Sequence, residues 1–491
     1  MLGKIVCFET LGCRLNQNES EGAARFFREA GFTCVMSAAS LQPDALDDVV
    51  LCVVNTCAVT AKAEQKCRRA IRVLLKKYPS VLLLITGCLA QLKGTLPSLP
   101  EDRLIFLPGF KKYLLKEIAA EMNGGQLDVT SGAFSLESLH SFVQQRCLSA
   151  ENCAGVNTSP LVKKQATDDR FSLYTAHFEA TSRASLKIQD GCDKNCAFCV
   201  IRLARGKSVS LSPDEVLRRV KQIEDAGYAE IVLTGVNLSL YSGQHEGSIF
   251  HLGELLEFLI ANTAKIKFRL SSLYPEQITK EFCCVLQSTR VQPFFHLSVQ
   301  SLCDSVLQNM GRSYSKQNVI DAVMRLRRFK DNPFISCDLI AGFPTEGVND
   351  FRETLQACQE LNFAWIHVFQ YSPREGTSAK DLKPLTAVVR KERAHTLWQI
   401  ACSGKVSYIR SCEGHIFDAV IEKPVIGVEG GKNTWRALTD NYLHAVFQCD
   451  GELQQGSVVR LRITSPMQES IQAGREEECR AQLVDLSLPC A

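Results

Sequence analysis

The first 123 residues alternate short apolar segments with longer segments of helical periodicity. Gly31 and Pro79 end two of the helical patterns. The predicted strands are Ile5–Thr10, Asp48–Asn55 and Val81–Thr86, and the predicted helices are Asn16–Ala30, Ala61–Tyr78 and Lys111–Met122. Consecutive βα units of this kind favour a parallel sheet with helices on its faces. We therefore expect residues 1–123 to form a Rossmann- or flavodoxin-like α/β domain.

A second, longer stretch of alternating patterns spans residues 183–405. Its strand candidates are Ala184–Gln189, Glu230–Leu233, Lys267–Ser271, Phe294–Val299, Phe334–Ile340 and Trp365–Gln370. The helical patterns between them are Pro213–Ala226, Leu252–Thr263, Ser305–Met310, Ser315–Phe329 and Asn349–Leu361. A closed βα barrel has eight such units. The six candidate strands therefore predict a partial (βα)6 barrel.

Residues 406–465 change to short strands with a period of two. The candidates are His415–Glu422, Thr434–Thr439, His444–Phe447 and Ser457–Thr464, and the turns between them contain Gly427, Gly430, Gly431, Asn433 and Gly451. This pattern predicts a small antiparallel β-barrel. We interpret residues 124–182 as a linker or insertion and residues 466–491 as a polar tail, and assign no firm structure to either.

Composition and charge narrow the class of protein. The net charge of +3 does not indicate a polyanion partner by itself, so a nucleic-acid surface has to be a local patch. No apolar run approaches the roughly 18–20 residues of a membrane span, and the N-terminus has no apolar signal region. We therefore expect a cytoplasmic protein that does not act at a membrane.

Cysteine is the unusual residue, with 22 copies in 491 residues. Without an export signal a disulfide framework is disfavoured, and thiols in this number indicate metal or cluster ligands beside ordinary buried cysteines. The sharpest pattern is a C-x3-C-x2-C loop after a predicted strand, formed by Cys192, Cys196 and Cys199. Three thiolates on one loop can hold three irons of a 4Fe-4S cluster. A structural zinc site takes four protein ligands, so three favour a cluster with one open iron.

Three further cysteines follow the three predicted strands of the first domain. Cys13, Cys57 and Cys88 each lie just beyond a strand, and Gly12 and Gly87 precede two of them. Because parallel strands end at one edge of a sheet, these cysteines can meet in space and hold a second 4Fe-4S cluster. Geometry alone makes this a weak argument, since buried cysteines at strand ends are common.

The loop that holds Cys192, Cys196 and Cys199, with Phe198 before the last cysteine, resembles the signature of the radical S-adenosylmethionine (SAM) superfamily. The resemblance implies that the open iron binds SAM and that an electron cleaves it to a 5′-deoxyadenosyl radical. Protein acids and bases then carry none of the chemistry, which belongs to cluster and cofactor. Loops at strand ends are the expected SAM contacts, although tight turns alone would explain them. The candidate residues are Gly235, Asn237, Ser301, Gly342 and Glu346.

The three N-terminal motifs, the cysteine loop and the terminal small barrel together resemble the methylthiotransferases. These radical SAM enzymes have an N-terminal auxiliary-cluster domain and a C-terminal TRAM domain. The motifs 11–20, 55–60 and 204–207 are most similar to the branch that modifies threonylcarbamoyl-adenosine. The isopentenyl-adenosine branch usually has Gly-Cys-Gln-Met-Asn in its first motif, which this chain lacks. The segment 124–182 departs from the family's compact linker.

This resemblance implies a reaction and its partners. It implies transfer of a methylthio group to C2 of threonylcarbamoyl-adenosine next to the tRNA anticodon, at position 37. It also implies two 4Fe-4S clusters, SAM and an electron donor of the flavodoxin or ferredoxin type. The alternatives are modification of isopentenyl-adenosine or of a ribosomal-protein aspartate, a lipoyl-synthase-like sulfur-inserting enzyme, and a zinc- and RNA-binding protein without enzymatic activity.

Basic clusters suggest where RNA binds. The predicted helix Ala61–Tyr78 carries seven cations, which are Lys62, Lys66, Arg68, Arg69, Arg72, Lys76 and Lys77. It follows Cys57 and is a candidate phosphate track, although a solvated helix face is an equal alternative. A second cluster is Arg325, Arg327, Arg328 and Lys330. The small barrel combines cations with aromatics that suit RNA or core packing, namely Lys423, Lys432, Arg436, Arg460, Arg462, Trp435, Tyr442 and Phe447.

Overall fold

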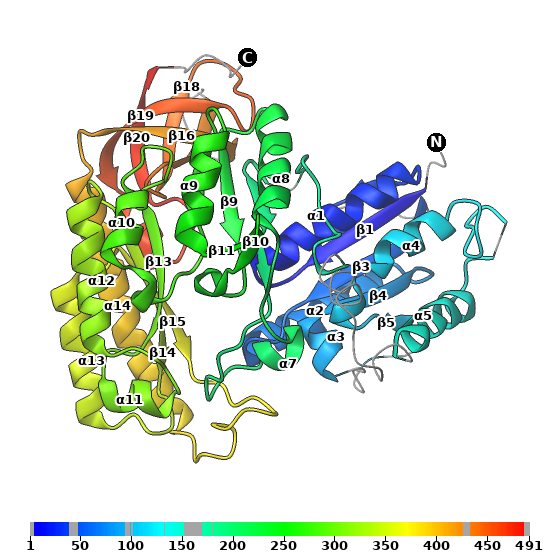
Figure 1. Ribbon diagram of the computed structural model, residues 1–491, viewed down its shortest axis with the longest axis horizontal. Helices are drawn as coiled ribbons and strands as arrows, with labels where there is room; N and C mark the ends of the chain where they lie inside the picture. Colours follow the sequence, from blue (N-terminus) through cyan, green and yellow to red (C-terminus); the bar gives the residue numbers. More distant parts are fainter. Residues whose placement is uncertain are drawn as a thin grey trace.

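The computed structural model describes residues 4–38, 48–93, 99, 102–131, 133–151, 169–179, 181–425 and 433–485. Figure 1 shows three parts: the N-terminal sheet on the right, a half-open barrel on the left and a small β-barrel above it. The predictions for Gly427, Gly430, Gly431 and Lys432 lie outside the described residues. The arrangement is α/β overall, as the sequence predicts.

The N-terminal domain is a five-stranded parallel sheet in the order β2-β1-β3-β4-β5. Its strands are β1 (Ile5–Thr10), β2 (Thr33–Val35), β3 (Val49–Thr56), β4 (Leu82–Gly87) and β5 (Leu104–Phe106). Its helices are α1 (Arg14–Glu29), α2 (Ala61–Lys77), α3 (Cys88–Lys93) and α4 (Leu114–Glu121), with the 3-10 turn η3 (Gly109–Lys111). This is the flavodoxin-like strand order, and its direction reverses between β1 and β3, where such sheets place their sites.

The central domain is the predicted partial barrel. Its strands β6 (Ala184–Lys187), β9 (Glu230–Thr234) and β12 (Lys267–Leu270) form one parallel sheet. The strands β13 (Phe294–Gln300), β14 (Phe334–Ala341) and β15 (Trp365–Gln370) form the next. Two isolated parallel bridges, Phe268 to Val291 and Leu273 to Leu297, join the sheets into one curved wall of six strands.

Helices cover the outer face of this wall, on the left of Figure 1. They are α8 (Pro213–Asp225), α9 (Leu252–Asn262), α10 (Lys280–Leu286), α11 (Asp304–Asn309), α12 (Lys316–Phe329), α13 (Val348–Leu361) and α14 (Ala387–Ser411). The sequence analysis missed α10 and α14. Helix α14 has apolar side chains on several sides because it contacts both the partial barrel and the small barrel, so it lacks the amphipathic period that identifies the others.

Short elements complete the central domain. They are β7 (Gln189–Asp190), β8 (Val209–Ser210), the hairpin β10 (Gly243–His245) with β11 (Ser248–Phe250), helix α7 (Ile201–Arg205) and the 3-10 turns η4 (Leu238–Leu240) and η5 (Pro275–Gln277). Strand β7 leads directly into the loop of Cys192 and pairs with β8. The cysteine loop is thus tethered at both ends.

The small barrel is closed by five strands in the order β16-β17-β18-β20-β19. They are β16 (Ile416–Pro424), β17 (Asn433–Thr439), β18 (His444–Cys449), β19 (Val458–Pro466) and β20 (Cys479–Asp485), with the short helix α15 (Gln468–Gln472) before β20. The segment from residue 466, to which the sequence assigned no firm structure, therefore supplies α15 and the closing strand β20. Strand β20 pairs with both β18 and β19 and so closes the barrel. Without β20 the barrel would have two open edges.

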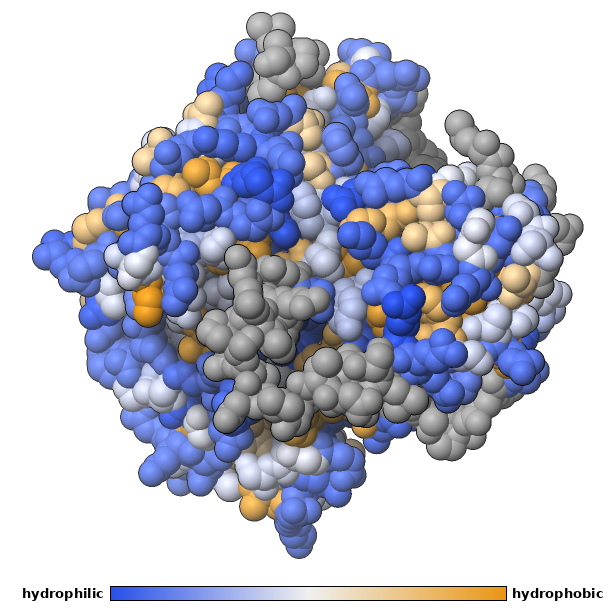
Figure 2. All heavy atoms as spheres, turned by 45° about the vertical axis from the view of Figure 1, so that its right-hand side comes forward, coloured by the Kyte–Doolittle hydropathy of each residue, from blue (hydrophilic) through white to orange (hydrophobic). Residues whose placement is uncertain are grey.

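The predicted linker contributes to the first domain. Its helix α5 (Leu136–Glu151) places Leu139, Phe142 and Val143 in the hydrophobic core beside the N-terminal sheet. Cys153 lies outside the described residues. Among the described residues no helix is long and apolar enough to cross a membrane. The face in Figure 2 is mostly hydrophilic, with apolar residues in small scattered groups.

Candidate active site

All six candidate cysteines line one cavity of about 380 Å³ between the N-terminal domain and the partial barrel. Cys13, Cys57 and Cys88 come from the sheet edge of the first domain. Cys192, Cys196 and Cys199 come from the loop after β7. The two sets were predicted separately, and the fold makes them face a common space.

Close backbone packing positions the N-terminal cysteines. Gly12 has φ +113°, and a Cβ at this residue would lie 2.7 Å from the Cβ of Cys57. Gly87 has φ +97°, and a Cβ there would lie 2.3 Å from the carbonyl oxygen of Thr56. Only glycine tolerates both the positive φ and the contact. These glycines therefore let the loops after β1, β3 and β4 converge, as the sequence predicts.

The second cysteine loop is held by contacts from the barrel. Arg312 donates a hydrogen bond to Sγ of Cys196 at 3.2 Å and another to the Tyr274 hydroxyl at 2.9 Å. Phe198 packs against an apolar cluster that includes Phe343 and Tyr371. Phe198 also lines the cavity.

Electrostatic interactions link the cysteines into two triads. Burial raises the pKa of Cys57 and of Cys199 to about 12, and it also raises the pKa of Cys192. In each set the neighbouring thiols raise these pKa values further, so each set lies close together. A bound cluster would replace these thiol protons, because its cysteine ligands are thiolates.

All six candidate ligands are cysteine thiols, the ligand type that iron–sulfur clusters take. In the described part of the chain no three His, Cys, Asp or Glu side chains are close enough to hold one metal ion. A cubane cluster spreads its thiolate ligands around a larger body than one ion does. Three cysteines around a shared cavity thus agree with a cluster whose remaining iron faces that cavity.

The predicted SAM contacts divide into two groups. Gly235 and Asn237 line the cavity, and the Asn237 side chain is buried with no partner for its Nδ2 among the described residues. Ser301, Gly342 and Glu346 are not among the lining residues. Glu346 accepts hydrogen bonds from the Gly342 amide at 3.2 Å and from Arg393, and so fixes a turn.

Other cavity residues were not foreseen from the sequence. Arg312 and Gln300 line it, and Gln300 has φ +67°, a conformation unusual for a residue other than glycine. Asp338 and Arg205 also line it. A lone arginine after Gly311 carries no recognisable pattern, so only the tertiary contacts identify Arg312.

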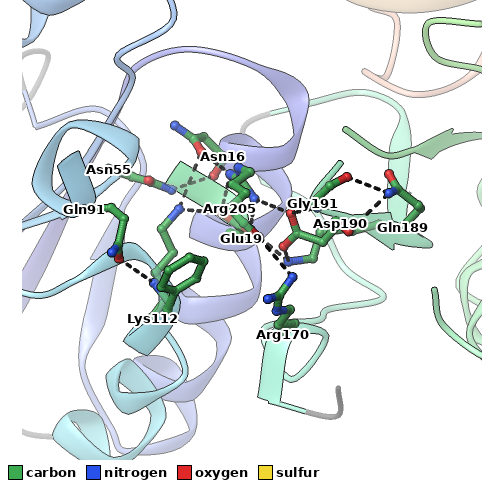
Figure 3. Close-up of polar contacts among 12 residues, drawn as sticks. Asn16, Glu19, Asn55, Gln91, Lys112, Arg170, Gln189, Asp190, Gly191 and Arg205 are labelled. Carbon is green, nitrogen blue, oxygen red and sulfur yellow. Dashed lines mark hydrogen bonds and ion pairs between the residues drawn. The ribbon is translucent and has the colours of Figure 1, made fainter. Parts of the chain in front are cut away.

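A buried charge network joins the two cysteine-bearing domains (Figure 3). Glu19 of α1 forms ion pairs with Arg205 at 2.9 Å, Lys187 at 2.8 Å and Lys112 at 2.5 Å. Arg205 also pairs with Asp190 at 3.0 Å, directly before the cysteine loop. Burial opposes ionisation of Glu19, but Arg205, Lys112 and Lys187 outweigh it and hold the pKa of this carboxyl well below its usual range.

The basic helix α2 presents its cations to solvent. Five of them are exposed and form no ion pair with any described residue, namely Lys62, Lys66, Arg69, Arg72 and Lys76. The second basic cluster is mostly structural, because Arg325, Arg327 and Lys330 donate to backbone carbonyls. In the small barrel Trp435 and Phe447 belong to the core. The core-packing alternative therefore holds for these two aromatics.

Comparison with known proteins agrees with this architecture. The radical SAM superfamily domain matches residues 186–358, and the domain described as uncharacterized protein family UPF0004 matches residues 5–104. The solved structure of the radical SAM methyltransferase TsrM from Kitasatospora setae, with tryptophan and a SAM analogue bound, covers 87% of this chain and 79% of its own at a TM-score of 0.50 and 11% identity. That likeness concerns the fold alone.

The partial barrel and its three-cysteine loop define a radical SAM enzyme. Threonylcarbamoyladenosine tRNA methylthiotransferase MtaB of Treponema pallidum is 40% identical over 93% of this chain and 98% of its own. The MtaB of Bacillus subtilis is 30% identical over 93% of both chains. The chain belongs to the MtaB family of radical SAM methylthiotransferases. Membership implies SAM and one 4Fe-4S cluster as cofactors.

Proposed function

We propose that this enzyme transfers a methylthio group to C2 of threonylcarbamoyl-adenosine at position 37 of tRNA, next to the anticodon. The relatives named above carry the same substrate in their names. The observation that carries the proposal is the single cavity lined by both cysteine triads. It brings the candidate ligands of a radical-generating cluster and of a sulfur-bearing cluster to the same space.

Each triad has a distinct task in this proposal. Cys192, Cys196 and Cys199 hold the cluster at which SAM binds. Cys13, Cys57 and Cys88 hold a second 4Fe-4S cluster that carries the sulfur to be transferred. The clusters and SAM supply the radical and sulfur chemistry, which no protein acid or base can supply at an aromatic C–H bond.

The chain's own residues bind, orient and shield. Gly235 and Asn237 line the cavity beside the cysteine loop and are the proposed SAM contacts. The Gln189 side chain connects them to that loop. It accepts a hydrogen bond from the backbone N–H of Asn237 at 2.9 Å and donates one to the backbone carbonyl of Gly191 at 2.7 Å. Phe198 closes the wall on the barrel side. Ser301, Gly342 and Glu346 remain predicted contacts.

The exposed basic face of α2 is the proposed tRNA phosphate track. The helix starts four residues after Cys57, and Thr60 caps it by accepting from the Ala63 amide at 3.1 Å. Val59 and Thr60 line the cavity itself. A tRNA whose phosphates bind along α2 would therefore reach the mouth of the cavity. Electrons would come from a flavodoxin- or ferredoxin-type donor in the cytoplasm.

Iron content, SAM cleavage and nucleoside mass spectrometry together test the proposal. We expect about eight irons per chain in the anaerobically reconstituted protein and about four in Cys57→Ala or Cys196→Ala. Cys57→Ala should still release deoxyadenosine without forming methylthio product, and Cys196→Ala should do neither. Cys67→Ala is the matched control, because Cys67 is buried beside Cys57 but does not line the cavity.

The proposal fails if wild-type protein binds about four irons. It also fails if Cys57→Ala forms the methylthio nucleoside at the wild-type rate. Product found only on isopentenyl-adenosine or on a ribosomal-protein aspartate would assign the enzyme to another branch of the family.

A further inference from the structure

A second cavity of about 330 Å³ adjoins the six-cysteine cavity. The two cavities share a wall formed by Cys13, Leu15, Gly235, Ser272 and Asp338. Its other lining residues come from the N-terminal helix α1, the partial barrel and the small barrel. This volume lies in the range of small-molecule pockets, roughly 300–1,000 Å³. All three domains therefore build one pocket beside a cluster ligand.

Arg14 gives this second cavity a positive charge that forms no ion pair with a carboxylate of the described residues. It is the first residue of α1, directly after Cys13, and it lines the cavity. Its guanidinium donates to the Tyr442 hydroxyl at 3.1 Å and forms no ion pair with any described residue. A guanidinium has five N–H donors, so most of those of Arg14 stay available for a ligand.

Tyr442 is held in place by its surroundings. Its ring stacks on Phe294 with ring centres 4.0 Å apart, and the guanidinium of Arg269 lies over the ring, 5.1 Å from its centre. Tyr442 also has φ +72°, so the turn before β18 aims it at the central domain under strain. The small barrel thus supplies a rigid partner for Arg14.

The remaining charges of this cavity do not neutralise Arg14. Asp338, the acidic residue that lines it, pairs with Nε2 of His296 at 3.0 Å. Arg269 is almost fully buried and binds Glu230 through two nitrogens at 2.7 Å each, while its Nη1 has no partner among the described residues. An anionic group entering the cavity would therefore meet unsatisfied guanidinium donors.

We propose that Arg14, positioned by Tyr442, binds the carboxylate of the threonylcarbamoyl group and thereby selects this acidic nucleoside. The adenine base lies towards the shared wall, and the threonylcarbamoyl group attached to it extends into the second cavity. A planar guanidinium matches a carboxylate in two parallel hydrogen bonds, which a neutral side chain cannot do. The inference rests on the proposed function, because it assigns a place to one group of that substrate.

The test compares two anticodon stem-loops that differ in one functional group. One carries threonylcarbamoyl-adenosine, and the other carries the same nucleoside with the carboxylate replaced by a carboxamide. Binding and single-turnover methylthiolation are measured on the anaerobically reconstituted enzyme with SAM. The wild type should prefer the carboxylate by about 10- to 100-fold. In Arg14→Gln the preference should fall to about threefold or less.

Two further variants separate recognition from stability. Arg25→Gln removes an arginine of the same helix that pairs with Glu29 at 3.3 Å and lines neither cavity, so it should keep the wild-type preference. Tyr442→Phe should lower the preference partly, since it removes the hydroxyl that positions Arg14. Iron content and deoxyadenosine release without RNA are measured for both arginine variants, and Arg25→Gln should keep the wild-type levels.

The outcomes distinguish this inference from the proposed function. If Arg14→Gln keeps the wild-type preference, or the wild type has none, the inference is overturned even when product forms. If binding shows a preference that depends on Arg14 but no methylthio product forms, the carboxylate site stands and the proposed reaction falls.

Discussion

Glu19 and Arg205 lie 186 positions apart in the sequence and form a buried ion pair of 2.9 Å. Glu19 belongs to the helix that starts after Cys13, and Arg205 ends the short helix that follows Cys199. Buried ion pairs are poor sources of net stability, because desolvation cancels most of the attraction. A fully buried network at this place therefore points to a geometric role, which is to fix one cysteine triad relative to the other.

Glu19→Gln should impair the coupling between the two triads. The variant removes the carboxylate that pairs with buried Lys112, while Arg205 and Lys187 keep only Asp190, and this should cost about 3–5 kcal/mol of unfolding free energy. We expect normal deoxyadenosine release but less methylthio product per deoxyadenosine. Urea unfolding and product ratios measure the two effects. The control Glu29→Gln removes an exposed pair of the same helix and should cost about 0.5 kcal/mol or less.

Loss of cations from α2 should weaken tRNA binding without altering the clusters. In the double variant Lys66→Gln and Arg69→Gln, each lost phosphate contact should lower the slope of log affinity against log salt by about 1. Fluorescence anisotropy at several salt concentrations measures this slope. The matched control removes Arg218 and Lys221 of α8, a helix that lines neither cavity. An equal loss in both double variants would mean that net charge alone attracts tRNA.

Acid stability should depend on Glu230 more than on most carboxylates. Burial alone would raise its pKa, but Arg269 and Arg183 outweigh burial and lower the pKa to about 2. A lowered pKa stabilises the fold above the unfolded value of about 4.3, and this contribution of about 3 kcal/mol disappears as the pH falls towards 2.

Glu230→Gln should therefore be less stable than the wild type at pH 7, and the difference should shrink as the pH falls from about 4.3 to about 2. Urea unfolding at each pH measures the difference. A constant difference across this range would show that the carboxylate does not titrate as the ion pairs with Arg269 and Arg183 require.

Cutting the chain after Pro466 should open the small barrel. The cut removes β20, which lies between β18 and β19 in the closed barrel. Two unpaired edges and the apolar core around Leu461 would then be exposed to water. We expect faster amide hydrogen exchange in β17 and β18, with unchanged exchange in the N-terminal sheet. Protected β17 amides in the shortened chain would contradict this prediction.

Local patterns were sufficient to predict most elements and the loop of Cys192, Cys196 and Cys199, whereas the prediction for Cys13, Cys57 and Cys88 rested mainly on the family resemblance. Cys13, Cys57 and Cys88 follow buried strands, and a parallel sheet necessarily brings the ends of such strands to one edge. Hydrophobic period alone located β15 to the residue, because Trp365–Gln370 is bounded by a helix and a turn. Features determined by neighbours in sequence were therefore accessible from sequence alone.

Features determined by distant contacts were not accessible. The polar segment Cys479–Asp485 alternates weakly, and only pairing with β18 and β19 makes it a strand. In the sequence, Glu19 and Arg205 look like ordinary surface charges. Only the packing of the two domains shows that they form a buried ion pair. Ser301 stays a predicted SAM contact, although its hydroxyl accepts from the Cys303 amide at 3.3 Å and the residue is not among those that line the cavity.

The position of β20, last in the sequence but between β18 and β19 in the barrel, also determines when the barrel can close during synthesis. The barrel closes only when β20 has been made, after every other strand of the three domains. Tyr442, the small-barrel residue that contacts Arg14, is held in a fixed position only once the barrel has closed. A nascent chain can thus bring both cysteine triads together before the wall proposed to bind the nucleoside is complete.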